Sequence, residues 1–111
     1  MEHIPIDNRT ENAVLGGIIT YPKYYDNIVP FIPSEDVFMQ SRGSRLWKKI
    51  SKMIRDNKKI DMMTMCQSIS EKDRSQGLTQ TFIVDCTSNV PVEDMLETYA
   101  RTLYEKYLLR I

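Results

Sequence analysis

The chain is poor in the side chains that most catalytic and metal-binding sites require. Its 111 residues include one histidine, His3, and two cysteines, Cys66 and Cys86, which lack the Cys-x-x-Cys spacing. A zinc site or a histidine-activated nucleophile needs several such side chains close together. The sequence therefore argues against both chemistries, and it favours two buried, reduced thiols over a disulfide.

Glycine is scarce as well, and no nucleotide-binding loop is present. None of the four glycines belongs to a Gly-x-x-x-x-Gly-Lys sequence, whose backbone N–H groups would cradle phosphates. The adjacent acids Glu35 and Asp36 could divide the roles of catalytic acid and base, but only in a pocket that separates their pKa values. Because the sequence indicates no such pocket, we interpret them as a solvated turn. We predict that this chain is not an enzyme and holds no cofactor or metal.

Charge and hydropathy argue against two further classes of protein. The formal net charge is zero, so no overall field attracts the chain to a polyanion. The longest uncharged stretch, Asn12 to Pro22, is shorter than the ~18 residues that a membrane-spanning helix needs. The first residues, MEHIPIDN, lack the basic and then apolar order of a secretion signal. We therefore expect a cytoplasmic protein whose residues 1–8 form a flexible N-terminus.

Two helices are predicted in the first thirty residues. Asn8 followed by Glu11 has the spacing of a capping box, which begins a helix that runs to Tyr21 before Pro22. A second, short helix is predicted from Lys23 to Val29.

Gly16 and Gly17 lie in the middle of the first predicted helix, where each glycine costs ~1 kcal/mol relative to alanine. With Ala13 and Thr20 they form a face of small residues. Such a face lets another helix approach closely, and the packing gained offsets the cost. We predict that the helix continues through both glycines; the alternative is that one of them ends it as a left-handed cap.

Three more helices are predicted between residues 41 and 86. The first spans Ser41 to Asn57 and has an apolar stripe formed by Leu46, Trp47, Ile50, Met53 and Ile54. Asp61 then caps a helix whose inner face consists of Met62, Met65, Cys66 and Ile69. Met63 falls off that inner face and is a candidate for a contact. The stretch Leu78 to Cys86 has a strand-like composition, yet no partner strand accompanies it. We favour a helix there, with an inner face of Leu78, Phe82, Ile83 and Cys86.

The last predicted helix runs from Val92 to Ile111 and has no stop signal. Its stripe contains Met95, Leu96, Tyr99, Leu103, Tyr107 and Leu108, and Glu97 forms a favourable i,i+4 pair with Arg101. The missing stop signal favours a chain cut from a longer protein; the alternative is a natural end that frays. The sequence as a whole predicts an all-α fold, a compact bundle of about six short helices.

Lys and Arg are concentrated in residues 42–59, which hold eight of the fifteen in the chain. A basic helix of this kind could contact phosphates, with Lys48, Lys49 and Lys52 as candidates. We favour a solvated face opposite the Trp47 stripe, because no aromatic residues that could stack on bases are interleaved on it.

Taken in order, four stretches resemble the N-terminal domain of the DnaB-type bacterial replicative DNA helicases. ENAVLGGII at residues 11–19 is similar to the family's E-x-A-V-L-G pattern, and Phe38 and Leu46-Trp47 follow where the family has apolar and aromatic residues. KIDMMTM at residues 59–65 is similar to a family pattern with Asp and Thr three residues apart. NVPVEDMLETYARTLYEKYLLR at residues 89–110 is similar to the family's Val-Pro stretch followed by a Tyr-Ala helix.

The resemblance implies a role in assembly. In this family the domain forms the collar of a hexameric ring, binds primase and sometimes loader proteins, and is joined to an ATPase domain that uses ATP and Mg²⁺ and moves on DNA. It implies a globular region over residues 9–91, with residues 92–111 as the first helix of a truncated C-terminal hairpin. The implied partner or oligomer interface contains Phe82, Tyr99, Leu103, Tyr104 and Tyr107.

The residues themselves leave two alternative functions open. The chain could be a stand-alone replication accessory protein with the same fold, or a small nucleic-acid-binding module that uses the basic helix of residues 42–59. The second alternative predicts DNA binding with a steep salt dependence.

Overall fold

The computed structural model describes residues 8–88 and 90–111, and all the regular structure in these residues is helical. The elements in chain order are α1 (Asn8–Thr20), η1 (Pro22–Tyr24), α2 (Tyr25–Ile28), η2 (Val29–Phe31), η3 (Glu35–Val37), α3 (Ser41–Arg55), α4 (Met62–Gln67), α5 (Glu71–Ser75), α6 (Gln80–Ser88), η4 (Glu93–Met95) and α7 (Leu96–Arg110), where η denotes a 3-10 helix. The predicted all-α class is confirmed. His3 and all but the last residue of the expected flexible N-terminus lie outside the described residues.

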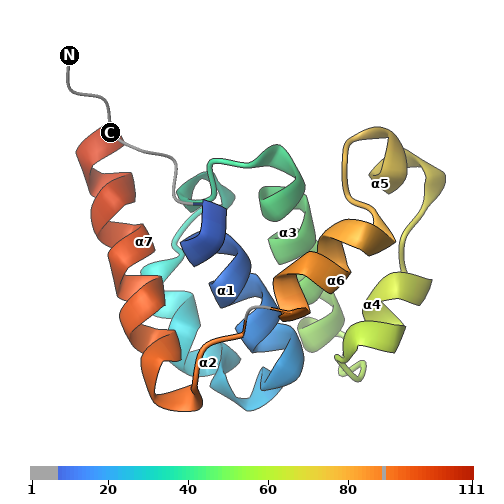
Figure 1. The fold of residues 1–111 in the computed structure, drawn as a ribbon, viewed down its shortest axis with the longest axis horizontal. Helices are drawn as coiled ribbons and strands as arrows, with labels where there is room; N and C mark the ends of the chain where they lie inside the picture. Colours follow the sequence, from blue (N-terminus) through green and yellow to red (C-terminus); the bar gives the residue numbers. More distant parts are fainter. Residues whose placement is uncertain (1–7, 89) are drawn as a thin grey trace.

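Helix α1 lies at the centre of the bundle, in contact with α3, α6 and α7 (Figure 1). Every residue from Ala13 to Ile19 is buried, as expected for a helix with neighbours on several sides. Helix α7 forms one edge of the molecule, and α4 and α5 form the opposite edge (Figure 1). None of the described helices is both long enough and apolar enough to cross a bilayer.

The two central glycines are sites of close packing, as the sequence predicts. A Cβ built on Gly16 would overlap the backbone carbonyl of Cys86 in α6, and one on Gly17 would overlap the side chain of Leu96 in α7. The helix continues through both glycines to Thr20. Their small size therefore sets how closely α6 and α7 approach α1.

The sequence predicts that Glu11 forms a capping box with Asn8, but its carboxylate has a different role in the structure. Helix α1 begins at Asn8, and the Glu11 carboxylate points toward the start of α3. It accepts hydrogen bonds from the backbone N–H of Met39 at 2.7 Å and of Gln40 at 3.3 Å, and from Gln40 Nε2 at 3.2 Å. These hydrogen bonds compensate the buried carboxylate for its removal from water. They also hold the segment before α3 against α1.

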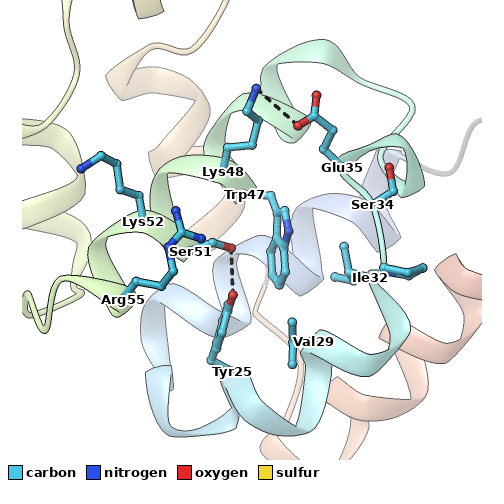
Figure 2. A pocket seen from close by; sticks show the side chains of 11 residues that line it. Tyr25, Val29, Ile32, Ser34, Glu35, Trp47, Lys48, Ser51, Lys52 and Arg55 are labelled. Carbon is cyan, nitrogen blue, oxygen red and sulfur yellow. Dashed lines mark hydrogen bonds and ion pairs between the residues drawn. The ribbon is translucent and has the colours of Figure 1, made fainter.

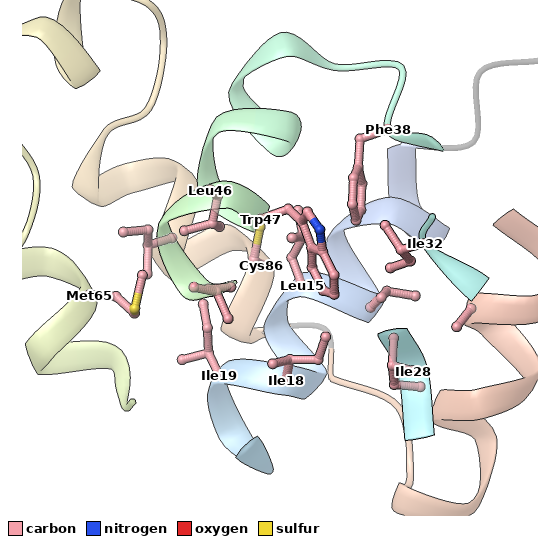
Figure 3. Packing of buried hydrophobic residues seen from close by; sticks show 14 of the residues in the cluster. Leu15, Ile18, Ile19, Ile28, Ile32, Phe38, Leu46, Trp47, Met65 and Cys86 are labelled. Carbon is pink, nitrogen blue, oxygen red and sulfur yellow. The ribbon is translucent and has the colours of Figure 1, made fainter. Parts of the chain in front are cut away.

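The apolar stripe of α3 faces the core as predicted. Figure 3 shows Trp47 beside Phe38 and Leu15, and the ring centroids of Trp47 and Phe38 lie 5.9 Å apart. On its other side Trp47 stacks on Tyr25, with centroids 5.3 Å apart. The predicted second helix corresponds to a succession of short turns, η1, α2 and η2, which carries Tyr25 to this position.

The middle of the chain contains both confirmed and missed features. Asp61 caps α4 by accepting a hydrogen bond from the Thr64 backbone N–H at 2.8 Å, as predicted. Met62, however, is 46% exposed, so its placement on the inner face was wrong, while Met63 is exposed as expected. Helix α6 is confirmed, and all four residues predicted for its inner face are buried. The short helix α5 was not predicted.

The last helix differs from the prediction in its phase. It begins at Leu96 after the 3-10 turn η4, and the buried residues are Leu96, Ala100 and Leu103. Met95 and Leu108, which were assigned to the stripe, are exposed. The predicted pair of Glu97 and Arg101 is present at 3.4 Å on the exposed side. Since α7 packs on α1 and contributes to the core, it belongs to the same packed body as the preceding helices.

Candidate functional site

Two of the five predicted interface residues have almost no surface. Phe82 is 1% exposed and Leu103 is 3% exposed, because both side chains are part of the core. The Arg42 guanidinium also covers the Phe82 ring, 4.2 Å from its centroid. In this fold both side chains pack in the core, and a role for them in an interface stays a prediction.

The three tyrosines of α7, Tyr99, Tyr104 and Tyr107, are half-buried and all contribute to intramolecular contacts. Tyr104 packs against Phe31, with ring centroids 6.4 Å apart. The Arg110 guanidinium lies 5.7 Å from the Tyr107 ring centroid and donates a 2.7 Å hydrogen bond to the backbone carbonyl of Asp36. These contacts attach α7 to η2 and η3, so the outer surface of the helix is held in a fixed position.

The end of α7 presents an apolar surface, here called the C-terminal apolar patch. Its members are Leu108, Leu109 and Ile111, which are 46%, 72% and 77% exposed. Adjacent large apolar side chains in water favour contact with another protein surface. The predicted residue Tyr104 lies one helical turn before Leu108, so it borders this patch.

A second exposed apolar group lies on α4 and α6. Met63 is 68% exposed, Met62 46% and Val84 39%. The Thr87 hydroxyl donates to the Met62 sulfur at 3.4 Å, which links the two helices. Methionine side chains adapt to irregular surfaces, so this group is also suited to protein contact.

The structure divides the predicted basic face into two sides of α3. On one side, Arg45 Nε and Lys49 Nζ lie 2.7 Å and 2.9 Å from the two carboxylate oxygens of Asp73. On the other side, Lys48 pairs with Glu35 at 3.3 Å and Lys52 with Asp56 at 3.0 Å. Lys49 therefore does not share a surface with Lys48 and Lys52, and contact with nucleic acid stays a prediction.

Asp73 is the centre of the first side, and sequence reasoning missed it. Burial alone would raise the pKa of its carboxyl, but hydrogen bonds from the Ser70 backbone N–H, Lys49 and Arg45 outweigh that effect. The pKa of Asp73 therefore lies well below its ordinary value. Ser70 and Asp73 also form a capping box at the start of α5, and the sequence SEKD carried that signal.

Both cysteines are free thiols, as predicted, but only Cys86 is buried as expected, while Cys66 is partly exposed. Burial raises the pKa of both thiols. For Cys86, which is fully buried in α6, the pKa is raised to about 12, so the thiol stays protonated. No group of three or more His, Cys, Asp or Glu side chains among residues 8–88 and 90–111 is arranged to hold a metal ion.

Known proteins resemble the chain over almost its whole length. Replicative DNA helicase DnaB of Pasteurella multocida (strain Pm70) is 22% identical over 107 residues, and that of Haemophilus influenzae (strain ATCC 51907 / DSM 11121 / KW20 / Rd) is 25% identical over 111 residues. Each match covers 96% of this chain but only 23% of the relative, so the chain spans about a quarter of the length of these curated relatives.

A solved structure and a family model agree with these matches. The crystal structure of the N-terminal domain of DnaB helicase from Mycobacterium tuberculosis matches with a TM-score of 0.86 at 21% identity, covering 97% of this chain and 78% of that one. At this identity the likeness shows the fold. The model of the DnaB-like helicase N terminal domain matches residues 3–105. The chain therefore belongs to the family of DnaB-like helicase N-terminal domains.

Proposed function

We propose that this chain is the non-catalytic N-terminal assembly domain of a replicative DNA helicase, which joins subunits into a ring and binds primase or a helicase loader during DNA replication. Family membership supports this proposal, as do curated relatives that are replicative DNA helicases. In this proposal ATP and Mg²⁺ are bound by an ATPase domain elsewhere in a cytoplasmic parent protein. That ATPase domain moves on DNA.

The observation that carries the assembly role is the C-terminal apolar patch on a firmly attached helix. Leu109 and Ile111 are more than two-thirds exposed, while Arg110 between them holds α7 to η3. A rigid apolar surface loses little conformational entropy when it docks, which favours a stable contact between subunits.

Light scattering of the chain over a range of concentrations tests this proposal. We expect a dimer or larger species at high concentration, and a stable complex when the C-terminal domain of the cognate primase is added. The double variant Leu109→Asp, Ile111→Asp should shift the chain to monomer with an unchanged circular dichroism spectrum, because both side chains lie outside the core.

Met63→Asp is the matched control, since Met63 is as exposed as Leu109 but lies on α4 at the opposite edge. It should leave the oligomeric state unchanged. If only this variant lost association, the result would assign the assembly surface to α4. A chain that is monomeric at every concentration and does not bind primase would contradict the assembly role.

A further inference from the structure

A groove of about 500 Å³ lies between α3 and the segment that runs from α2 to η3 (Figure 2). Its apolar wall is formed by Tyr25, Val29, Ile32 and Trp47. The Tyr25 ring stacks on Trp47, and the Tyr25 hydroxyl donates a 2.9 Å hydrogen bond to Ser51 Oγ. Because these contacts fix the aromatic side chains, the groove is formed before any ligand binds.

Three cations of α3 line the same groove. Lys48, Lys52 and Arg55 are exposed and follow the i, i+4, i+7 spacing that places side chains on one face of a helix. The one acid in the lining is Glu35, whose carboxylate lies 3.3 Å from Lys48 Nζ (Figure 2). The lining therefore carries an excess of positive charge beside an apolar wall.

The ion pair of Glu35 and Lys48 indicates which anion the groove accepts. Both side chains are well exposed, at 43% and 62%, and exposed pairs of this kind contribute little to stability and exchange readily. An incoming carboxylate can thus take the place of Glu35 on Lys48. A nucleic-acid strand fits less well, because a phosphate backbone has no apolar group to place on this wall. Trp47, at 6% exposure, also offers no free ring face on which a base could stack.

We infer that this groove binds an acidic segment of a partner protein, which places an apolar side chain against Tyr25, Val29 and Ile32 and its carboxylates on the cations of α3. Apolar contact provides affinity, and the charges select the partner and speed its encounter. No residue of α7 lines the groove, so the inference does not depend on the proposed assembly function.

Trp47 offers a direct readout, since it is the only tryptophan in the chain and its side chain forms part of the groove wall (Figure 2). The probe is a synthetic peptide of sequence EDLFEDL, titrated into the ¹⁵N-labelled chain and followed by NMR. We expect the Trp47 indole and Ser51 amide resonances to shift. The peptide QNLFQNL, which keeps the apolar residues and lacks the charges, should bind at least about tenfold more weakly.

Matched variants test the charges of the groove. Lys48→Glu with Lys52→Glu should weaken binding of the acidic peptide at least about tenfold. Glu35→Gln should strengthen binding, because it removes the carboxylate that competes for Lys48. Lys72→Glu with Arg74→Glu, an equal charge change at exposed residues of α5 that do not line the groove, should leave the affinity nearly unchanged.

Several results would overturn the inference. They are equal binding of QNLFQNL and EDLFEDL, an affinity that Lys48→Glu with Lys52→Glu leaves unchanged, or no shift of the Trp47 indole at millimolar acidic peptide. A labelled oligothymidine that shifts the same resonances at lower concentration than EDLFEDL would instead assign the groove to nucleic acid.

Discussion

The backbone carbonyl of Cys86 occupies the position that a Cβ on Gly16 would need, so α6 rests directly on the backbone of α1. At Gly17 the neighbour is the end of the Leu96 side chain, which can move away by changing its rotamer. The two glycines are adjacent in sequence, yet they differ in how much their surroundings can move.

We therefore expect Gly16→Ala to lower the free energy of unfolding by about 2 kcal/mol or more, because overpacking against backbone outweighs the better helix propensity of alanine. Gly17→Ala should cost less, since Leu96 can shift. Urea denaturation of both variants measures the difference. Equal costs, or a more stable Gly16→Ala variant, would show that α6 can move away from α1 without loss.

Glu11→Gln tests the buried acid that joins α1 to the segment before α3. A carboxylate accepts hydrogen bonds from Met39 and Gln40 with both oxygens, whereas an amide offers one oxygen and turns its NH₂ group toward a donor. We expect a loss of about 2 kcal/mol in the free energy of unfolding. Glu97→Gln, at an exposed ion pair on α7, is the control and should change stability by less than about 0.5 kcal/mol.

The helices could be predicted from sequence because their signals are local. The spacing of Leu78, Phe82, Ile83 and Cys86 identified α6 in spite of its strand-like composition, and all four residues are buried. The SEKD sequence before α5 is equally local, so the capping box of Ser70 and Asp73 could have been found in the same way.

The candidate interface was harder to predict than the helices. In a sequence, an apolar residue that faces the core cannot be distinguished from one that faces a partner. Phe82 and Leu103 face the core, while Leu109 and Ile111 are exposed. The stripe on α7 was misplaced because Ala100, a small residue that carries little hydropathy signal, is fully buried there.

The role of Glu11 depends on donors 28 and 29 residues away in sequence. The groove likewise depends on a contact between distant residues, because the Tyr25 hydroxyl donates a hydrogen bond to Ser51, which lies 26 residues further along the chain. Spacing along one helix carries no information on such pairs.

Asp73 should make stability dependent on pH. Its pKa in the folded chain lies below the ordinary value of 3.8, so its contribution is present above about pH 5 and is lost as the pH falls below 3.8. At pH 7 we expect Asp73→Asn to be about 2 kcal/mol less stable than the natural chain, and the difference should shrink toward pH 3. Glu71→Gln on the same helix should change little. A difference that does not vary with pH would mean that the carboxylate charge is not what holds α5 to α3.

The two thiols should differ in reactivity, since Cys86 is fully buried and Cys66 is partly exposed. The thiolate is the reactive form, and burial raises the pKa of the Cys86 thiol to about 12, so almost none of it is ionised at pH 8. With a disulfide reagent under native conditions we expect one thiol, Cys66, to react slowly and Cys86 to react only when the chain unfolds. Cys66→Ala assigns the reactive residue, because this variant should show no labelling before unfolding. Rapid labelling of that variant in the folded state would mean that α6 separates from α1 often enough to expose Cys86, which contradicts the close packing at Gly16.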